Sequence, residues 1–428
     1  MRDDFFTSYL HYTRNNEVPT FFHRWSAIAG LGALLGRNYS LRFGHQTLQP
    51  NIYCMLLGSP GTRKSTAIKI MKSLLVQSGY EHLAADKSTK EKFLLDLSGA
   101  QYDDKGKLIR DVLAENIFGD AEDESTAPPR EMFIAADEFN DFFGNGNIEF
   151  ISLLGTLWDY EGVYKNRIKN GISVSIPHPT VSILGGNTPT GFALAFPSEI
   201  LGQGFFSRIL LIYGESSGKK IAFPVPPTID ETNAILRQLA NIRMNAIGLC
   251  SLEPSAEKLL TKIYTSWKGI DDVRFESYSN RRFTHLLKLC LIHSASRQIQ
   301  DTQGNVSTKQ VITEQDVIYA NTVLVHTERF MPRALGEFGK SKHSDVSHKI
   351  MQVVEKAEKP LTLQEIYKHI DRDVTVIEVQ TLIKNLQVAQ KLQSTGTGYL
   401  PIKTMAVEFA SDEVDFSFLT EEERKLGE

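Results

Sequence analysis

The segment that most constrains the fold of this chain covers residues 51–70, where an apolar run is followed at once by a glycine-rich turn. Residues 52–57 read Ile-Tyr-Cys-Met-Leu-Leu, and such an unbroken run predicts a strand of a parallel sheet that is buried on both faces. The turn, residues 58–65, reads Gly-Ser-Pro-Gly-Thr-Arg-Lys-Ser, and residues 65–71 are predicted to be helical. This order of strand, turn and helix predicts an α/β fold with a parallel sheet.

The turn carries residue types that bind phosphate. Gly58 and Gly61 let backbone N–H groups approach an anion, and a helix N-terminus favours negative charge. Lys64 can reach β- and γ-phosphates, and the Ser65 hydroxyl can ligate Mg²⁺. Arg63 departs from the usual Walker A pattern, which has glycine there, but the alternative, an ordinary junction with a stray lysine, needs no such order of residues. The predicted ATP-binding residues are Gly58, Ser59, Pro60, Gly61, Thr62, Arg63, Lys64, Ser65 and Thr66.

A second apolar strand, predicted at residues 132–136, ends in two carboxylates, Asp137 and Glu138. Ligands bind beyond the carboxyl ends of parallel strands, which is where these side chains would lie. We expect Asp137 to hold Mg²⁺, directly or through water, and Glu138 to orient and polarise the attacking water. The alternative is an acidic helix cap after a strand. The catalytic interpretation is favoured because the two carboxylates lie downstream of Lys64 in the sequence.

Two further strand ends complete the predicted catalytic set. The strand at residues 179–184 leads to Asn187, whose side chain can hydrogen-bond a γ-phosphate or the attacking water. Arg208 comes directly before the apolar strand at residues 209–213. At a subunit edge this arginine would reach a neighbour's nucleotide in trans, and the alternative is an intrachain salt bridge. The predicted catalytic residues are therefore Lys64, Glu138, Asn187 and Arg208.

Residues 163–176 contain two alternating runs around an Asn-Gly pair at 170–171, which predicts a β-hairpin. Lys165, Arg167 and Lys169 are spaced two apart, so their side chains project from one face of the first strand. Such a cluster favours binding to DNA phosphates. An exposed strand edge protected by lysines is the alternative, and we weigh the two equally.

The order of these motifs resembles that of the hairpin-bearing AAA+ helicases. The minichromosome-maintenance type also replaces the glycine before the Walker lysine and has a Ser-Arg-Phe arginine finger. Residues 51–213 are also similar to a family of phage and mobile-element P-loop ATPases, a domain of unknown function often encoded among replication genes, which shares the Leu-Trp-Asp-Tyr-Glu-Gly run at 157–162. The resemblance covers about half the chain. It implies a ring of six subunits that uses ATP and Mg²⁺ to move along single-stranded or forked DNA as a helicase in phage replication.

The remaining sequence suggests five regions. They are an N-terminal helical segment (1–50), the P-loop ATPase core (51–215, with a helix expected at 108–118), a helical lid (216–335), a winged helix (345–405) and an acidic disordered tail (406–428). Family analogy makes Arg281, Arg282 and Lys288 candidates for a second phosphate sensor on a lid helix. A solvated basic helix face is the favoured alternative.

The C-terminal regions suggest partner proteins. The third helix expected in the winged helix, at residues 376–388, has only Lys384 and Lys391 near its end, which favours protein contact or weak DNA contact over sequence-specific reading. Acidic, aromatic tails such as residues 406–428 are either solubilising or dock on basic clefts of partners. A second function from a different class is therefore an ATP-switched replication initiator or helicase loader that does not translocate.

Composition bears on nucleic-acid binding and on the cellular compartment of the protein. With 47 Lys plus Arg against 51 Asp plus Glu the net charge is -4, so any nucleic-acid surface must be local. The 3 cysteines lie far apart in apolar runs, which fits free thiols in a reducing cytoplasm, the host's if the chain is phage-encoded. The most apolar segment, residues 25–35, contains glycines and is too short to span a bilayer. We therefore expect a cytoplasmic protein without a membrane segment.

Overall fold

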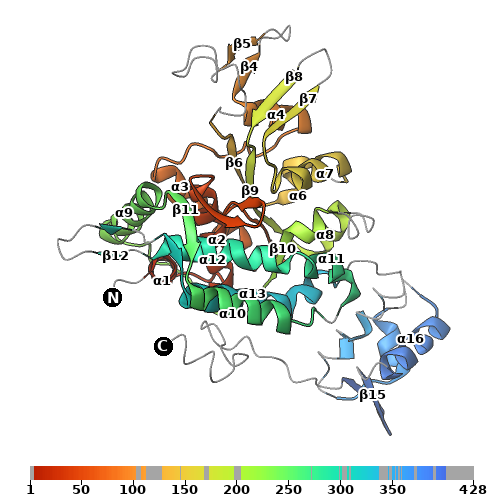
Figure 1. The fold of residues 1–428 in the computed structure, drawn as a ribbon. Coiled ribbons are helices and arrows are strands. Elements are labelled where there is room, and N and C mark those ends of the chain that lie inside the picture. Colours follow the sequence, from red (N-terminus) through yellow and green to blue (C-terminus); the bar gives the residue numbers. More distant parts are fainter. Residues whose placement is uncertain are drawn as a thin grey trace. The chain divides into compact units, whose positions relative to one another are not determined.

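A computed structural model shows the fold (Figure 1). It describes residues 4–102, 108–111, 128–144, 146–167, 173–196, 204–270, 272–297, 299–300, 306–307, 310–336, 346, 349–351, 353–354, 357, 359–370, 374–388 and 392–401. Residues up to 335 form one compact unit, and residues 336–410 belong to a second. The two units are described separately below.

The first unit is built on a four-stranded sheet in the order β10 (Ile209–Tyr213), β3 (Tyr53–Leu57), β9 (Thr180–Asn187) and β6 (Glu131–Ala136). All three pairings between neighbours are parallel. Every residue of β3 is buried, as the unbroken apolar run predicts for a strand covered on both faces. The predicted α/β fold with a parallel sheet is thereby confirmed.

Two long helices pack against each other and against this sheet. α3 (Lys64–Gln77) follows the glycine-rich turn, and α2 (Thr20–Leu35) comes from the N-terminal segment. A Cβ atom on Gly30 of α2 would lie 2.4 Å from Cε of Met71 on α3. A side chain larger than hydrogen at residue 30 would displace the Met71 side chain, so glycine here favours the close approach of the two helices.

Residues 216–335 belong to the same unit. A second sheet has the order β14 (Val311–Ile312), β11 (Gly248–Leu252), β1 (Tyr39–Phe43) and β2 (Gln46–Leu48), so β11 pairs directly with β1 of the N-terminal segment. α13 (Glu314–Ala334) packs on β10 and on α12 (Arg282–Ser296), which also contacts α2. The other elements here are α1 (Phe5–Tyr12), α9 (Ile229–Asn245), α10 (Pro254–Ser266), α11 (Glu276–Ser279), β12 (Ile299–Gln300), β13 (Val306–Ser307) and the short 3-10 helix at Val273–Phe275.

Two basic residues of α12 are not solvated. The Arg282 side chain is 3% exposed and forms an ion pair of 2.7 Å with Glu328. Lys288 is fully buried, with its Nζ 2.8 Å from Oδ1 of Asp159. The solvated-face interpretation is therefore wrong for both, because α12 packs between α2 and α13 and its cations are neutralised inside the unit. Arg281, just before α12, is half-buried.

A peripheral part of the first unit carries two antiparallel strand pairs. β7 (Val163–Arg167) pairs with β8 (Ser173–Pro177), which confirms the predicted hairpin. β4 (Ala100–Tyr102) pairs with β5 (Leu108–Asp111). The helix predicted at residues 108–118 is therefore wrong over its described part, because cross-strand pairing outweighs a weak helical pattern. α4 (Lys90–Ser98) contacts both β8 and β4, and all of these lie together at the top of Figure 1.

The second unit has its own small core. It contains helical backbone at 346, 349–351 and 353–354, then α15 (Leu363–Lys368), α16 (Val376–Val388), and the antiparallel pair β15 (Leu392–Thr395) and β16 (Gly398–Pro401). An isolated bridge joins Leu361 to Tyr399 of β16. Its buried side chains are Val346, Ile350, Val354, Ile366, Ile370, Val379, Leu382, Ile383, Leu386 and Leu392. Lys391 and residues 406–428 lie outside the described residues.

Two expectations from composition can be compared with the structure. The cysteines, Cys54, Cys250 and Cys290, are buried and free, as predicted. Among the helices of the described part of the chain, none is both long and apolar enough to cross a membrane.

Candidate functional site

Three strand ends converge at one edge of the parallel sheet. Leu57, the last residue of β3, is in register with Asn187, the last residue of β9. Ala136, the last residue of β6, is in register with Gly185. The glycine loop (residues 58–65), the carboxylates that follow β6, and Asn187 between them therefore lie along the same edge, as the sequence predicts.

Two residues of the glycine loop have left-handed backbone conformations. Gly61 has φ 86°, and Arg63 has φ 62° and ψ 23°, which is the left-handed region. Glycine adopts this conformation at little cost, which explains why the usual pattern has glycine at the position of Arg63. Here the arginine side chain reaches Oε2 of Glu17 at 2.6 Å. Arg63 thus adopts a backbone conformation that glycine adopts more easily, and its side chain is held by an ion pair.

Close backbone packing surrounds the loop. A Cβ atom on Gly58 would lie 2.4 Å from the carbonyl oxygen of Gly214, and one on Gly186 would lie 2.5 Å from that of Asp137. Glycine is therefore required at both strand ends, and the backbones of β3, β9, β10 and the segment after β6 meet without side chains between them. The glycine loop then leads directly into α3, whose N-terminus favours negative charge.

Lys64 is held inside this loop by neutral acceptors. Its Nζ donates hydrogen bonds to the carbonyls of Gly58 at 2.7 Å and Ser59 at 3.0 Å, and to Oγ1 of Thr62 at 3.1 Å. Burial lowers the pKa of Lys64 to about 8, while the nearby Glu138 carboxylate acts in the opposite direction. The ammonium group pairs with no carboxylate among the described residues, so an anionic phosphate fits its environment.

The predicted magnesium ligands lie on neighbouring elements. Ser65 is half-buried in the first turn of α3, and Asp137 directly follows β6. Oδ2 of Asp137 is 2.8 Å from Nζ of Lys69, one turn further along α3. Within the described residues, no group of three or more His, Cys, Asp or Glu residues is placed to hold a metal ion. Mg²⁺ is commonly held by one or two protein oxygens together with substrate phosphates, so Ser65 and Asp137 fit that ion.

If Asp137 holds Mg²⁺ as predicted, replacing Lys69 with methionine should increase the affinity for that ion, because the lysine pairs with this carboxylate. An exposed ion pair of this kind contributes about 0.2–1 kcal/mol, so the half-saturating Mg²⁺ concentration should fall by a factor of up to roughly five. The measurement is ATP hydrolysis against Mg²⁺ concentration. Lys72→Met is the matched control, because Lys72 on the same helix pairs with Asp86 instead. An unchanged or higher Mg²⁺ requirement in Lys69→Met would contradict the assignment of Asp137.

The amide of Asn187 is tied to a residue that the sequence did not reveal. Its Oδ1 accepts a hydrogen bond from the backbone N–H of Thr188 at 2.8 Å, and its Nδ2 donates to Oδ1 of Asn140 at 2.6 Å. Asn140 lies in α6 (Phe139–Phe143), two residues after Glu138. The only sequence signal for it is that closeness to the carboxylates, since a single asparagine on a short helix has no distinctive pattern.

Arg208 lies at the opposite edge of the sheet. It ends the 3-10 helix η4 (Phe206–Arg208), and the next residue, Ile209, is in register with Tyr53 at the start of β3. The two edges lie at opposite ends of β3, which has five residues. At about 3.3 Å per residue, the distance between these ends is roughly 15 Å. Arg208 therefore cannot reach the glycine loop of its own chain.

The surroundings of Arg208 do not neutralise it fully. Its guanidinium lies 5.9 Å from the ring centroid of buried Trp158 and donates to the carbonyl of Gly204. Burial and the positive charge of Arg281 lower its pKa, while Asp159 raises it. Among the described residues it forms no ion pair and its buried Nε has no hydrogen-bond partner. The predicted alternative, an intrachain salt bridge, is not observed in this part of the chain.

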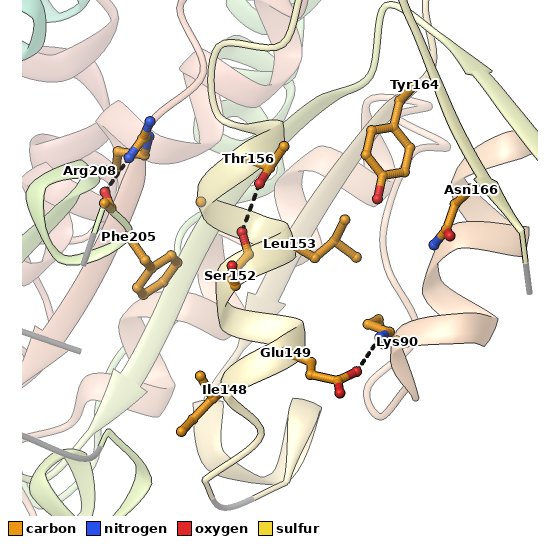
Figure 2. Close-up of a pocket in the computed structure, with 12 residues that line it drawn as sticks. Lys90, Ile148, Glu149, Ser152, Leu153, Thr156, Tyr164, Asn166, Phe205 and Arg208 are labelled. Atoms are coloured by element: carbon orange, nitrogen blue, oxygen red, sulfur yellow. Dashed lines mark hydrogen bonds and ion pairs between the residues drawn. The ribbon is translucent and has the colours of Figure 1, made fainter. Parts of the chain in front are cut away.

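Arg208 borders a hollow of about 820 Å³ that runs along α7 (Ile148–Leu157). Figure 2 shows Arg208 and Phe205 on one side of the helix and the hairpin residues Tyr164 and Asn166 on the other. Lys165 of the predicted DNA-binding set is exposed and alternates with these two hairpin residues. Arg167 is placed on the same strand by its backbone, and Lys169 lies outside the described residues.

The structure thus brings Lys64, Ser65, Asp137, Glu138 and Asn187 together at one sheet edge and keeps Arg208 at the other. Comparison of the chain with protein-family models and with curated proteins gives no match.

Proposed function

We propose that residues 51–215 form a P-loop, AAA+-like core that hydrolyses ATP. The observation that carries this proposal is the convergence at one edge of the parallel sheet. Lys64 on its loop and the carboxylates Asp137 and Glu138 flank Asn187, which ends the strand between them. Phosphoanhydride hydrolysis needs these three kinds of group in one place: a cation for phosphate, carboxylates for metal and water, and a polar donor.

Each residue has a separate role in this scheme. Lys64 neutralises phosphate charge, and the backbone N–H groups at the start of α3 bind phosphate oxygens. Ser65 and Asp137 hold Mg²⁺, which when bound neutralises negative charge on the phosphates. Glu138 accepts a hydrogen bond from the attacking water and orients it. Asn187 donates a hydrogen bond to the γ-phosphate or to that water.

We further propose that the chain works as a homo-oligomeric ring, with six subunits expected, as a DNA helicase in phage replication. The half-buried Arg208, too far from its own loop and without an ion-pair partner in the described part of the chain, supports a role at a neighbour's site. The hairpin with exposed Lys165 supports contact with DNA phosphates. The helices and strand pair of the second unit are compatible with the expected winged helix.

The hairpin tests this function. Replacing Lys165, Arg167 and Lys169 together with alanine should weaken single-stranded DNA binding and lower its salt slope by roughly two, because each cation that neutralises a phosphate adds about 0.7 to that slope. Basal ATP hydrolysis should survive because the hairpin is far from the chemistry, while DNA-stimulated hydrolysis and strand displacement on a forked duplex fall together.

A matched triple variant, with alanine at the exposed Lys258, Lys262 and Lys268, removes the same charge elsewhere and should behave like the parent protein. Normal unwinding by the hairpin variant would contradict translocation through this hairpin.

A second function, an ATP-switched initiator or loader, is favoured by one feature of the second unit. The first turn of α16 exposes apolar side chains, with Val376 43% and Ile377 76% exposed. Apolar groups there suit a protein surface better than DNA phosphates. ATP hydrolysis without any strand displacement on forked DNA would favour this second function.

A further inference from the structure

Asn140 links the segment that carries the proposed catalytic carboxylate to the end of β9. It lies in α6, which begins directly after Glu138. Its Nδ2 donates a hydrogen bond of 3.0 Å to the carbonyl of Gly191 in α8 (Pro189–Ala195), and its Oδ1 accepts from Asn187 at 2.6 Å. One side chain therefore joins α6, the end of β9 and the start of α8.

The hydrogen bonds determine which way each amide points. The backbone N–H of Thr188 can only donate, so the atom of Asn187 that faces it at 2.8 Å must be Oδ1. The carbonyl of Gly191 can only accept, so the atom of Asn140 that faces it must be Nδ2. The remaining pair, Nδ2 of Asn187 and Oδ1 of Asn140, is then correctly matched as donor and acceptor.

Aromatic packing fixes the relative positions of α6 and α8, the two helices that carry these hydrogen bonds. The ring of Phe196, just after α8, lies 6.3 Å from Phe139 and 5.6 Å from Phe143 of α6, and 4.3 Å from Phe192 of α8. All four side chains are buried. Because buried rings in close contact leave little room for movement, Asn140 and Gly191 have fixed relative positions.

We propose that Asn140 is a positioning residue that fixes the Asn187 amide for hydrolysis. Asn187 Nδ2 carries two hydrogens and uses one on Asn140, and the described residues offer its second N–H no partner. With Oδ1 committed to Thr188, that N–H has a defined direction at the sheet edge shared with the glycine loop. Without Asn140 the Asn187 amide can rotate, and its free N–H no longer has a fixed direction. The inference rests on the proposed ATPase function and names a residue that supports it without touching nucleotide.

Gly191 offers an independent way to disturb the same amide. A Cβ atom on Gly191 would lie 2.3 Å from Oδ1 of Asn187 and 3.0 Å from Oγ1 of Thr188. Gly191→Ala must therefore displace the Asn187 side chain, although it removes no hydrogen-bonding group. Asn140→Leu removes the partner. Asn140→Asp keeps an oxygen that accepts from Asn187, but its second oxygen faces the carbonyl of Gly191, which can only accept.

The test is steady-state ATP hydrolysis by the full chain. Since loss of one preorganised donor costs roughly 10²–10³ in kcat, Asn187→Leu should lie in that range and Asn140→Leu should lose roughly tenfold to a hundredfold. KM for ATP should change by less than about twofold, because the affected hydrogen bond acts after binding. Asn140→Asp should recover only part of the loss, because it cannot donate to the carbonyl of Gly191, and Gly191→Ala should resemble Asn140→Leu. Asn245→Leu, whose amide bonds only to its own helix α9, is the matched control.

The double variant Asn140→Leu/Asn187→Leu separates positioning from a general structural effect. If Asn140 acts through Asn187, the double variant should be no slower than Asn187→Leu alone. If the losses of the two single variants multiply in the double variant, the proposal is overturned. A normal kcat in Asn187→Leu would instead remove the proposed role of Asn187 itself. Thermal melting of each variant identifies losses caused by unfolding, and Gly191→Ala keeps the proposal testable if Asn140→Leu does not fold.

Discussion

Lys64→Ala should bind ATP more weakly, whereas Glu138→Gln should keep binding and lose turnover. The ammonium of Lys64 sits within the loop, 2.7 Å from the carbonyl of Gly58, on neutral acceptors that a phosphate can replace. A charge-assisted hydrogen bond contributes about 1.5–3 kcal/mol, so ATP affinity should fall roughly tenfold to a hundredfold in Lys64→Ala. Glu138→Gln keeps the shape of the side chain and removes its basicity, so kcat should fall by roughly 10²–10³ or more.

Nucleotide titration by calorimetry and single-turnover hydrolysis measure these two effects separately. Lys72→Ala on the same helix is the control, since that lysine pairs with Asp86. If either Lys64→Ala or Glu138→Gln hydrolyses ATP at the parent rate, the site assignment is wrong.

The pH dependence of ATP binding gives a further check on the same lysine. Burial lowers the pKa of Lys64 to about 8 in the free protein, and phosphate would raise it by favouring the charged form. The free protein therefore holds a charged lysine below pH 8 and loses that proton above it. ATP affinity should be constant below pH 8 and weaken as the pH rises further. Above pH 8, Lys64 should take up a proton when ATP binds. Lys64→Ala should show no such dependence between pH 8 and 9.

Arg208→Ala should be nearly inactive although its own glycine loop is intact. An arginine that stabilises transition-state charge contributes roughly 10³–10⁵ in kcat. Because η4 places Arg208 at the opposite sheet edge from Lys64, we expect this contribution to be made to a neighbouring subunit. ATP binding should remain normal, since Arg208 contacts no part of the loop that holds the nucleotide in its own chain.

Mixing two inactive proteins tests the trans role. Arg208→Ala and Lys64→Ala subunits combined in equal amounts should regain activity, because about one interface in four in a randomly mixed ring has both groups intact. Lys64→Ala mixed with Glu138→Gln is the matched control and should stay inactive, since both defects lie at the same edge of each subunit. Mixed assemblies that form, as shown by affinity tags on each variant, yet remain inactive in the first mixture would disprove the trans role.

Local sequence was sufficient for the elements whose residues specify their own conformation. The strand at 52–57, the glycine loop and the start of α3 were predicted because apolar runs, glycines and helix starts act within a few residues. The alternating runs of the β7–β8 hairpin behave in the same way. By contrast, the segment at 108–111 becomes a strand only because residues 100–102 pair with it.

Burial of charge was the second kind of information that the sequence lacked. Lys288 and Arg282 read as a solvated basic face, yet each meets a carboxylate distant in sequence, Asp159 and Glu328 respectively. The sequence pattern of a helical lysine is the same whether its ammonium group is solvated or paired with a buried aspartate. Only packing of α12 between α2 and α13 decides which it is.

The sequence by itself determined that a parallel strand leads through a glycine-rich loop into a helix, and that carboxylates and an asparagine follow two other strands. The tertiary structure alone decided that these ends share one edge, that Arg208 lies at the other, and that Asn140 holds Asn187. The physical reason is the range of the interactions. Backbone conformation depends on neighbouring residues, whereas strand order, burial and side-chain partners depend on contacts between segments far apart in the chain.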